Sequence, residues 1–348
     1  MLLETRRGVR RNEWILISVL SICAVAVFVM LAVQVSGADA KEEKKNYIKW
    51  VEFDVCYSAL QKALDEDIAT HNQKDPIPWI QTLAYLGAKY GGDFSRYKAK
   101  DMDVYFAKRR EGKTQAEITA DMEYYDYYYQ AYSAVLGGLV GSYAVELEDE
   151  NGNKEIRKSY GLKAFSPIAQ GYNYSHYEDF GNSRSYGFQR RHLGNDLLGS
   201  IGTPITAVES GIVECIGWNQ YGGWRIGIRS FDKKRYYYYA HLRKDHPYAE
   251  GLQEGQIVTA GDVIGYLGMT GYSTQENVNG MNVPHLHFGL QLIFDESQKE
   301  GDHEIWIDVY DLVELLEKHR TSVYKQEKEY YRKYPFTDPA VLNHAGEG

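Results

Sequence analysis

The chain has 348 residues, room for about two domains of ~150 residues each. Its hydrophobic content of 44% and charged content of 25% are typical of a folded protein. The net charge of −9 disfavours a nucleic-acid partner, because nucleic-acid binders usually carry a basic patch or stripe.

The N-terminus predicts a membrane anchor. Four arginines in residues 1–13 precede an almost unbroken apolar run over residues 14–35. That run is long enough to cross a hydrocarbon core, which needs ~20 apolar residues. A cleaved signal peptide has a shorter apolar region, although residues 38–40 are similar to a cleavage site. By the positive-inside rule, residues 1–13 are cytoplasmic and the rest of the chain is extracytoplasmic. We therefore expect a single-pass cell-membrane protein, with a secreted protein as the alternative.

After a charged linker, residues 46–159 predict a helical, membrane-proximal domain. Apolar side chains recur at three- and four-residue steps from Trp50 to Ile68, which is one face of a helix. A second helix is expected over residues 79–90, ended by two glycines. A third begins at the capping-box pair Thr114 and Glu117 and runs through a tyrosine-rich stretch to residue 136. We interpret the tyrosine clusters as packing and interface surface, so protein partners would bind this domain.

From residue 160 the pattern changes to short strands separated by glycines. This spacing predicts a mainly antiparallel β domain over residues 160–320. The expected strands are residues 205–209, 212–216, 225–229, 235–240, 263–267 and 286–292. A helix should follow over residues 308–319, and residues 321–348 read as a polar, loosely ordered tail. The predicted fold class is α+β: a transmembrane helix, a helical domain and a C-terminal β domain.

A pair of histidines on one predicted strand carries the strongest chemical signal. His285 and His287 alternate with Leu286 and Phe288, the period-two pattern of a strand with one buried face. Side chains two residues apart on a strand point the same way, so both imidazoles leave one face. Taken alone, such a pair is more often two surface histidines on a strand, because short motifs have high false-positive rates.

Two further segments supply the other residues that a metal site would need. His192 and Asp196 are four residues apart, and His241 ends an aromatic strand. A catalytic zinc site takes three N or O protein ligands, with water in the open fourth position. His192, Asp196 and one histidine of the pair supply that set. Two histidines then remain for proton transfer and oxyanion stabilisation.

The order of these segments resembles the lysostaphin/LytM-type zinc endopeptidases, which cleave peptide bonds in bacterial peptidoglycan. The resemblance covers roughly residues 165–292. It rests on six segments in the family's order: His192 to Asp196, Gly202-Thr203-Pro204, Gly211-Ile212-Val213, Tyr239-Ala240-His241-Leu242, Gly261 to Gly265 and His285-Leu286-His287-Phe288. It implies a membrane-anchored zinc metalloprotease that hydrolyses stem or cross-bridge peptides. A non-catalytic wall-binding protein or membrane-complex scaffold of the same fold is the alternative.

The resemblance also implies a role for each site residue. His192, Asp196 and His287 would bind Zn²⁺, and His285 would be the general base. His241 would polarise the water or stabilise the oxyanion. Tyr186 occupies the position of an oxyanion tyrosine in some members, with core packing as the alternative.

Two departures from the family pattern stand out. An added loop, residues 275–283, separates Thr270-Gly271-Tyr272-Ser273-Thr274 from the histidine pair, and we expect it to line the groove. Gly289 stands where the family commonly has Glu, which removes a partner for the ligands. The remaining histidines are expected to be surface or capping residues. Asp179 and Glu209 are expected to be solvated charges.

Overall fold

The structure is a computed structural model that describes residues 47–149, 151–185, 189–301 and 303–346. Residues Ile48–Gly348 form one compact unit, and every element below belongs to it. No helix among the described residues is long and apolar enough to cross a membrane. The predicted anchor, residues 14–35, and the cytoplasmic tail, residues 1–13, lie outside the described residues.

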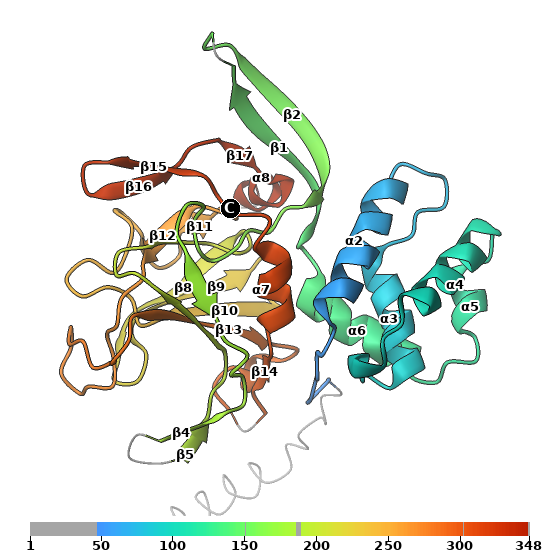
Figure 1. Ribbon diagram of the computed structural model, residues 1–348, viewed down its shortest axis with the longest axis horizontal. Helices are drawn as coiled ribbons and strands as arrows, with labels where there is room; N and C mark the ends of the chain where they lie inside the picture. The colour runs from blue at the N-terminus through green and yellow to red at the C-terminus, as the bar shows by residue number, and fades with distance from the viewer. Residues whose placement is uncertain (1–46, 150, 186–188, 302, 347–348) are drawn as a thin grey trace, which may run out of the picture. The chain divides into compact units, whose positions relative to one another are not determined.

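The helices of the N-terminal half gather into one cluster (Figure 1). They are α2 (Tyr57–Thr70), α3 (Trp79–Tyr90), the 3₁₀ turn η1 (Phe94–Arg96), α4 (Ala99–Arg110), α5 (Gln115–Thr119) and α6 (Tyr125–Leu136). The α3 prediction is confirmed, and Gly91 ends that helix in the left-handed conformation at φ 67°. The capping box is confirmed as well, because Thr114 and Glu117 cap α5 reciprocally.

The predicted first and third helices are only partly right. α2 begins at Tyr57, so Trp50 lies in an extended segment and is 64% exposed. A remote carboxylate fixes that start: the Tyr57 amide donates to Asp311 Oδ1 at 2.6 Å. The third helix is interrupted between α5 and α6. α4 was not predicted, because its apolar residues do not form a clear stripe.

The C-terminal half is built on an antiparallel sheet, as predicted. Its strand order is β11-β8-β9-β10-β13-β6-β3, and β14 also pairs with β13. The strands are β3 (Tyr174–His176), β6 (Asn195–Gly199), β8 (Gly211–Asn219), β9 (Gly223–Ser230), β10 (Arg235–Ala240), β11 (Ile257–Val258), β13 (His285–Leu292) and β14 (Ile305–Ile307). Smaller pairs are β7 (Pro204–Thr206) with β12 (Val263–Tyr266) and β4 (Ser183–Ser185) with β5 (Gln189–Arg191). The fold class α+β is therefore confirmed for helices 57–136 and the β domain.

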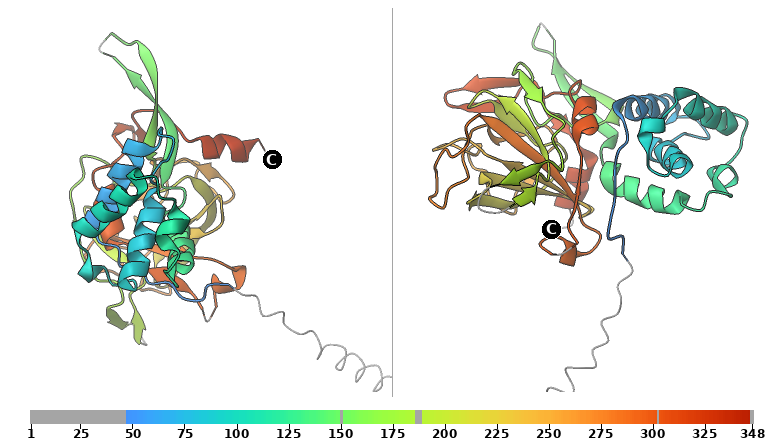
Figure 2. Two further views of the ribbon diagram at one scale, coloured as in Figure 1. Left: turned by 90° about the vertical axis from the view of Figure 1, so that its right-hand side faces the viewer. Right: turned by 60° about the horizontal axis from the view of Figure 1, so that its bottom comes forward.

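Two regions depart from the sequence expectation. β1 (Val140–Glu148) and β2 (Lys154–Leu162) form a long hairpin inside the segment that the sequence assigned to helices (Figure 2). The segment expected to be a loose tail is ordered instead: it contains β15 (Val323–Gln326), β16 (Glu329–Arg332), β17 (Phe336–Thr337) and α8 (Pro339–Ala345). β17 pairs with β1, and buried Asp338 accepts from Lys163 at 2.8 Å and caps α8.

The core side of the sheet joins the helical half through α7 (Tyr310–Leu316) and a buried ion pair. α7 falls within the predicted helix and buries Leu312 and Leu316. Arg235 is 1% exposed, forms a bidentate pair with Glu209 at 2.7 and 3.0 Å, and donates to the Ala134 carbonyl of α6 at 2.8 Å. Glu209 is thus a buried structural residue, and the expectation of a solvated charge was wrong.

Candidate metal centre

Strand register brings the predicted ligands together. β13 lies between β6 and β10, with His287 directly opposite Asp196 on one side and Ala240 on the other. His192 precedes β6 by two residues, and His241 follows β10 directly. Residues opposite each other on neighbouring strands face the same side of the sheet. Side chains almost 100 positions apart in the chain therefore converge on one face.

The three predicted ligands form the metal-binding group that the described residues contain. His192 Nε2 lies 2.8 Å from His287 Nδ1 and 3.1 Å from Asp196 Oδ1, and His287 Nδ1 lies 3.3 Å from Asp196 Oδ1. Ligand bonds of ~2.0–2.1 Å at tetrahedral angles separate donor atoms by about 3.3 Å. The donor set of two nitrogens and one oxygen therefore fits a zinc ion with one position left open.

The other two histidines turn a ring nitrogen toward this group. His241 Nδ1 lies 2.8 Å from the Thr270 carbonyl oxygen, and His285 Nδ1 lies 2.8 Å from the Val283 carbonyl oxygen. A carbonyl only accepts, so we assign the proton of each neutral ring to Nδ1. Nε2 of each ring is then an acceptor. His285 Nε2 lies 3.7 Å from Asp196 Oδ1, at the edge of the metal group.

The electrostatics of the group favour a cation. Burial raises the pKa of Asp196, but hydrogen bonds from His192 and His287 outweigh burial and hold that pKa far below its usual range. Burial lowers the pKa of His241 well below its ordinary value, and the neighbouring His285 and His287 lower it further. His241 is thus neutral at pH 7. A carboxylate that stays ionised beside the neutral His241 ring is suited to a metal ion.

Asp179 orients the first ligand, which the sequence did not predict. Its carboxylate Oδ2 lies 3.1 Å from His192 Nδ1, and its Oδ1 accepts from the Asp196 amide at 3.2 Å. Arg184 donates to Asp179 Oδ2 at 2.6 Å and holds it in place. Burial lowers the pKa of His192, but hydrogen bonds to Asp179 and Asp196 raise it to about 9. Because Asp179 contacts Nδ1 of His192, Nε2 is left as the metal-binding atom. Asp179 is thus part of the site, and the expectation of a solvated charge was wrong.

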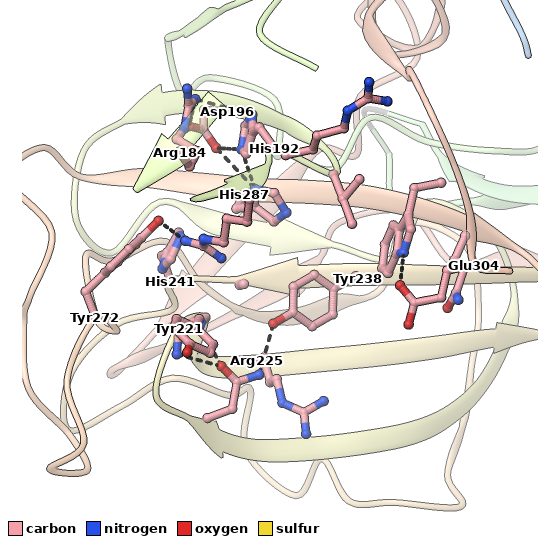
Figure 3. Close-up of a pocket in the computed structure, with 18 of the residues that line it drawn as sticks. Arg184, His192, Asp196, Tyr221, Arg225, Tyr238, His241, Tyr272, His287 and Glu304 are labelled. Carbon is pink, nitrogen blue, oxygen red and sulfur yellow. Dashed lines mark hydrogen bonds and ion pairs between the residues drawn. The ribbon is translucent and has the colours of Figure 1, made fainter. Parts of the chain in front are cut away.

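The metal group opens into a groove of about 510 Å³ (Figure 3). Tyr238 and Trp306 form part of its lining, together with Met281 from the added loop. The structure also explains Gly289: a Cβ there would lie 2.9 Å from the Trp306 ring and 2.8 Å from the Leu193 carbonyl oxygen. The Trp306 ring occupies the space that a side chain at this position would need.

Other sequence predictions for the site have mixed outcomes. Tyr186 lies outside the described residues, so the oxyanion role stays a prediction. His71 caps α2, with Nδ1 2.8 Å from the Ile68 carbonyl oxygen, which confirms a capping histidine. His176 is instead half-buried and stacks on Tyr310 at 4.3 Å between ring centroids.

An antiparallel sheet presents two imidazoles and a carboxylate at one open groove, which is the arrangement of a catalytic zinc site with an open position. Comparison with known proteins agrees with this interpretation. Residues 190–300 match Peptidase family M23. The domain over residues 190–300 is therefore similar to peptidase family M23, and His192, Asp196 and His287 form the kind of zinc site that is typical of that family.

The relatives below match part of the chain. The L-Ala--D-Glu endopeptidase of Bacillus subtilis is 41% identical over 130 residues, which is 37% of this chain and 38% of the relative. Lysostaphin of Staphylococcus simulans is 40% identical over 98 residues, 28% of this chain and 17% of the relative. The solved catalytic domain of lysostaphin from that organism is 31% identical; the match covers 41% of this chain and 93% of that domain, with a TM-score of 0.31. The chain thus spans less than half the length of these curated relatives.

Proposed function

We propose that this protein is a zinc-dependent endopeptidase that hydrolyses peptide bonds in the stem or cross-bridge peptides of bacterial peptidoglycan. The observation that carries the proposal is the convergence of His192 Nε2, Asp196 Oδ1 and His287 Nδ1 within 3.3 Å of one another in an open groove. The match of residues 190–300 to Peptidase family M23 supports a peptidase reaction.

The chain's own residues divide the work of hydrolysis. Zinc, when bound, supplies a Lewis acid that polarises the scissile carbonyl and lowers the pKa of a water towards ~7. His285 is the general base in this proposal: its Nδ1 is held by the Val283 carbonyl, so Nε2 takes the proton of the attacking water. A neutral imidazole accepts such a proton at its unprotonated nitrogen.

His241 has a narrower role than the sequence could assign. Its Nδ1 proton points to the Thr270 carbonyl, so the neutral ring offers only an acceptor at Nε2. An acceptor can orient and polarise the water, whereas stabilising an oxyanion needs a donor. We therefore assign His241 to the water. Its backbone lies at φ 60°, an uncommon conformation for a residue other than glycine, which turns the ring toward the site.

Digestion of purified peptidoglycan tests the proposal. Mass spectrometry of the soluble fragments should show new amino and carboxyl termini at one kind of peptide bond. Release should stop with a chelator, return with added Zn²⁺ and be absent for Asp196→Ala. Intact walls after treatment with zinc-loaded protein, or equal release by Asp196→Ala, would reject the peptidase.

The proposal includes a location. We propose that residues 14–35 anchor the protein in the cell membrane and that the catalytic domain lies outside the cytoplasm, where the wall substrate is. The support is the arginine-rich N-terminus followed by the apolar run. Deleting residues 1–35 should move the protein from the membrane fraction to the soluble fraction. A mature N-terminus after residue 40 would favour the secreted form instead.

A further inference from the structure

The groove continues across the sheet beyond the metal ligands. His287 on β13 lies opposite Asp196 on β6 and opposite Ala240 on β10. The pairing of Tyr239 with Ile226 brings the next residue of β9, Arg225, opposite Ala240 on the same face. Neighbouring strands lie ~4.8 Å apart, so the Arg225 backbone is about 10 Å from that of His287. That span corresponds to about three residues of an extended peptide.

Arg225 lines this groove without an acidic partner. Among the described residues, no carboxylate forms an ion pair with it, and its Nε is buried without a hydrogen-bond acceptor. The side chains that surround the guanidinium are Cys215, Tyr236 and Tyr238. A half-buried guanidinium that keeps its charge without a counter-ion is costly. In Figure 3 Arg225 and Tyr238 lie in the part of the groove away from the His192 and Asp196 ligands.

Two other cations that line the groove, Arg184 and Lys299, already have acidic partners. Arg184 donates to Asp179 at 2.6 Å, and Lys299 forms an ion pair with Glu214. The Arg190 guanidinium lies 5.1 and 5.0 Å from the centroids of two tyrosine rings. Arg225 differs from Arg184 and Lys299, because an incoming ligand would have to supply its counter-ion. Among the described residues, no ring stacking like that of Arg190 occupies its guanidinium.

The surroundings of Arg225 would strengthen such a contact. The Tyr236 ring covers Gly227, where a Cβ would come within 2.0 Å of the Tyr236 hydroxyl oxygen. Burial raises the pKa of Tyr236 and of Tyr238, so both phenols stay neutral at pH 7 and do not neutralise the arginine. Aromatic walls exclude water, and an ion pair is stronger where water is excluded.

We propose that Arg225 binds a carboxylate of the substrate peptide within about three residues of the cleaved bond. It thereby selects acidic stem-type peptides over uncharged, glycine-only bridges. Guanidinium and carboxylate match as a planar, bidentate pair, which suits Arg better than Lys. The inference rests on the proposed peptidase function and adds the substrate class that the groove prefers.

Matched peptides test the inference. Two stem peptides of one sequence are compared, one with a free glutamate carboxylate near the cleaved bond and one with the corresponding carboxamide. We expect the wild-type kcat/KM to be about 10- to 100-fold higher for the acid. Arg225→Gln should bring the kcat/KM for the acid down to that for the amide, so that the acid-to-amide ratio falls to about one. The kcat/KM of Arg225→Lys for the acid should lie between the values for wild type and Arg225→Gln.

Arg157→Gln is the matched control. It removes the same charge as Arg225→Gln, but Arg157 is exposed on β2. It should keep the wild-type ratio. The ratio is measured on one preparation, so a partly unfolded variant does not distort it. An equal acid-to-amide ratio in wild type and Arg225→Gln, or no preference in the wild type, would overturn the inference. Zinc-loaded wild type that cleaves neither peptide nor purified wall would instead reject the peptidase function, and this inference with it.

Discussion

The two faces of the central sheet carry two polar clusters that differ in how they are satisfied. On the core face each guanidinium nitrogen of Arg235 has a protein acceptor, and Glu209 also accepts from Tyr237 at 2.7 Å. On the groove face, ring nitrogens of His192 and His287 face each other at 2.8 Å beside an ionised carboxylate. The first cluster is complete within the protein. The second becomes complete only with a cation, which is why we assign stability to one and chemistry to the other.

Side chains of β10 alternate between the core face and the groove face, so one strand contributes to both clusters. On β10, Arg235, Tyr237 and Tyr239 face the core, whereas Tyr236 and Tyr238 line the groove side. A run of four tyrosines thus serves two purposes, and composition alone does not distinguish them. The predictions below test whether the clusters can be perturbed separately.

The largest effect should come from removing a ligand. Asp196→Ala should abolish stoichiometric zinc binding and lower kcat/KM by at least about 10³-fold, because the metal and its activated water are lost together. Metal analysis and peptide cleavage measure both losses, and circular dichroism should show an unchanged fold. If Asp196→Ala kept both its zinc and full activity, catalysis would not depend on this metal group.

A histidine outside the metal group should separate chemistry from binding. His285→Ala should keep zinc and lower kcat by about 10²–10⁴-fold, the usual contribution of a general base. Single-turnover cleavage with metal content measured on the same sample tests this. Loss of zinc from His285→Ala would make His285 a ligand instead.

Substitutions in the core-face cluster should lower the stability of the fold. Glu209→Gln removes the bidentate partner of buried Arg235 and leaves only Asp232, whose Oδ2 accepts from Arg235 at 2.9 Å and which is the second carboxylate of this cluster. We expect a loss of about 3–5 kcal/mol in unfolding free energy. The double variant Glu209→Gln with Arg235→Met should recover part of that loss, because no buried charge remains. Urea unfolding measures both variants. A Glu209→Gln protein as stable as wild type would show that the pair is dispensable.

Asp179 should have a smaller effect, on metal affinity. Asp179→Asn weakens the acceptor for His192 Nδ1, and we expect zinc affinity to fall by about 10–100-fold. Competition with a chromogenic chelator measures the change. Asp232→Asn, a carboxylate of the core-face cluster, should leave zinc affinity unchanged. Equal affinities for Asp179→Asn and wild type would remove Asp179 from the site.

The smallest effect concerns a histidine outside both clusters. Burial lowers the pKa of His176 to about 4 from its ordinary 6.5. The native ring stays neutral while the unfolded chain takes up a proton, so stability present above pH 6.5 is lost as the pH falls toward 4. His176→Phe should reduce this loss by on the order of 2 kcal/mol. Urea unfolding at pH 7 and pH 4.5 tests it, and an unchanged pH dependence would contradict it.

Local patterns explain what the sequence could predict. The alternation of His285 to Leu290 gave β13, and the spacing of the glycine-punctuated runs gave most of the sheet. The capping box and Gly91 gave two helix ends. These signals lie within a few residues of each other, so propensity and periodicity capture them.

Long-range pairing decided what the sequence missed. The tail is ordered because β17 pairs with β1, almost 200 residues away. α2 starts at Tyr57 because Asp311 caps it. Asp179 meets His192, and Arg225 faces the groove, only through the path of the folded chain. No local pattern distinguishes such residues from ordinary surface charges.

Anomalous diffraction at the zinc edge, from crystals of the zinc-loaded protein, tests the central claim most directly. The account predicts one strong peak about 2 Å from His192 Nε2, Asp196 Oδ1 and His287 Nδ1, with a fourth position open to solvent. No peak there, or a zinc ion bound by other residues, would contradict it.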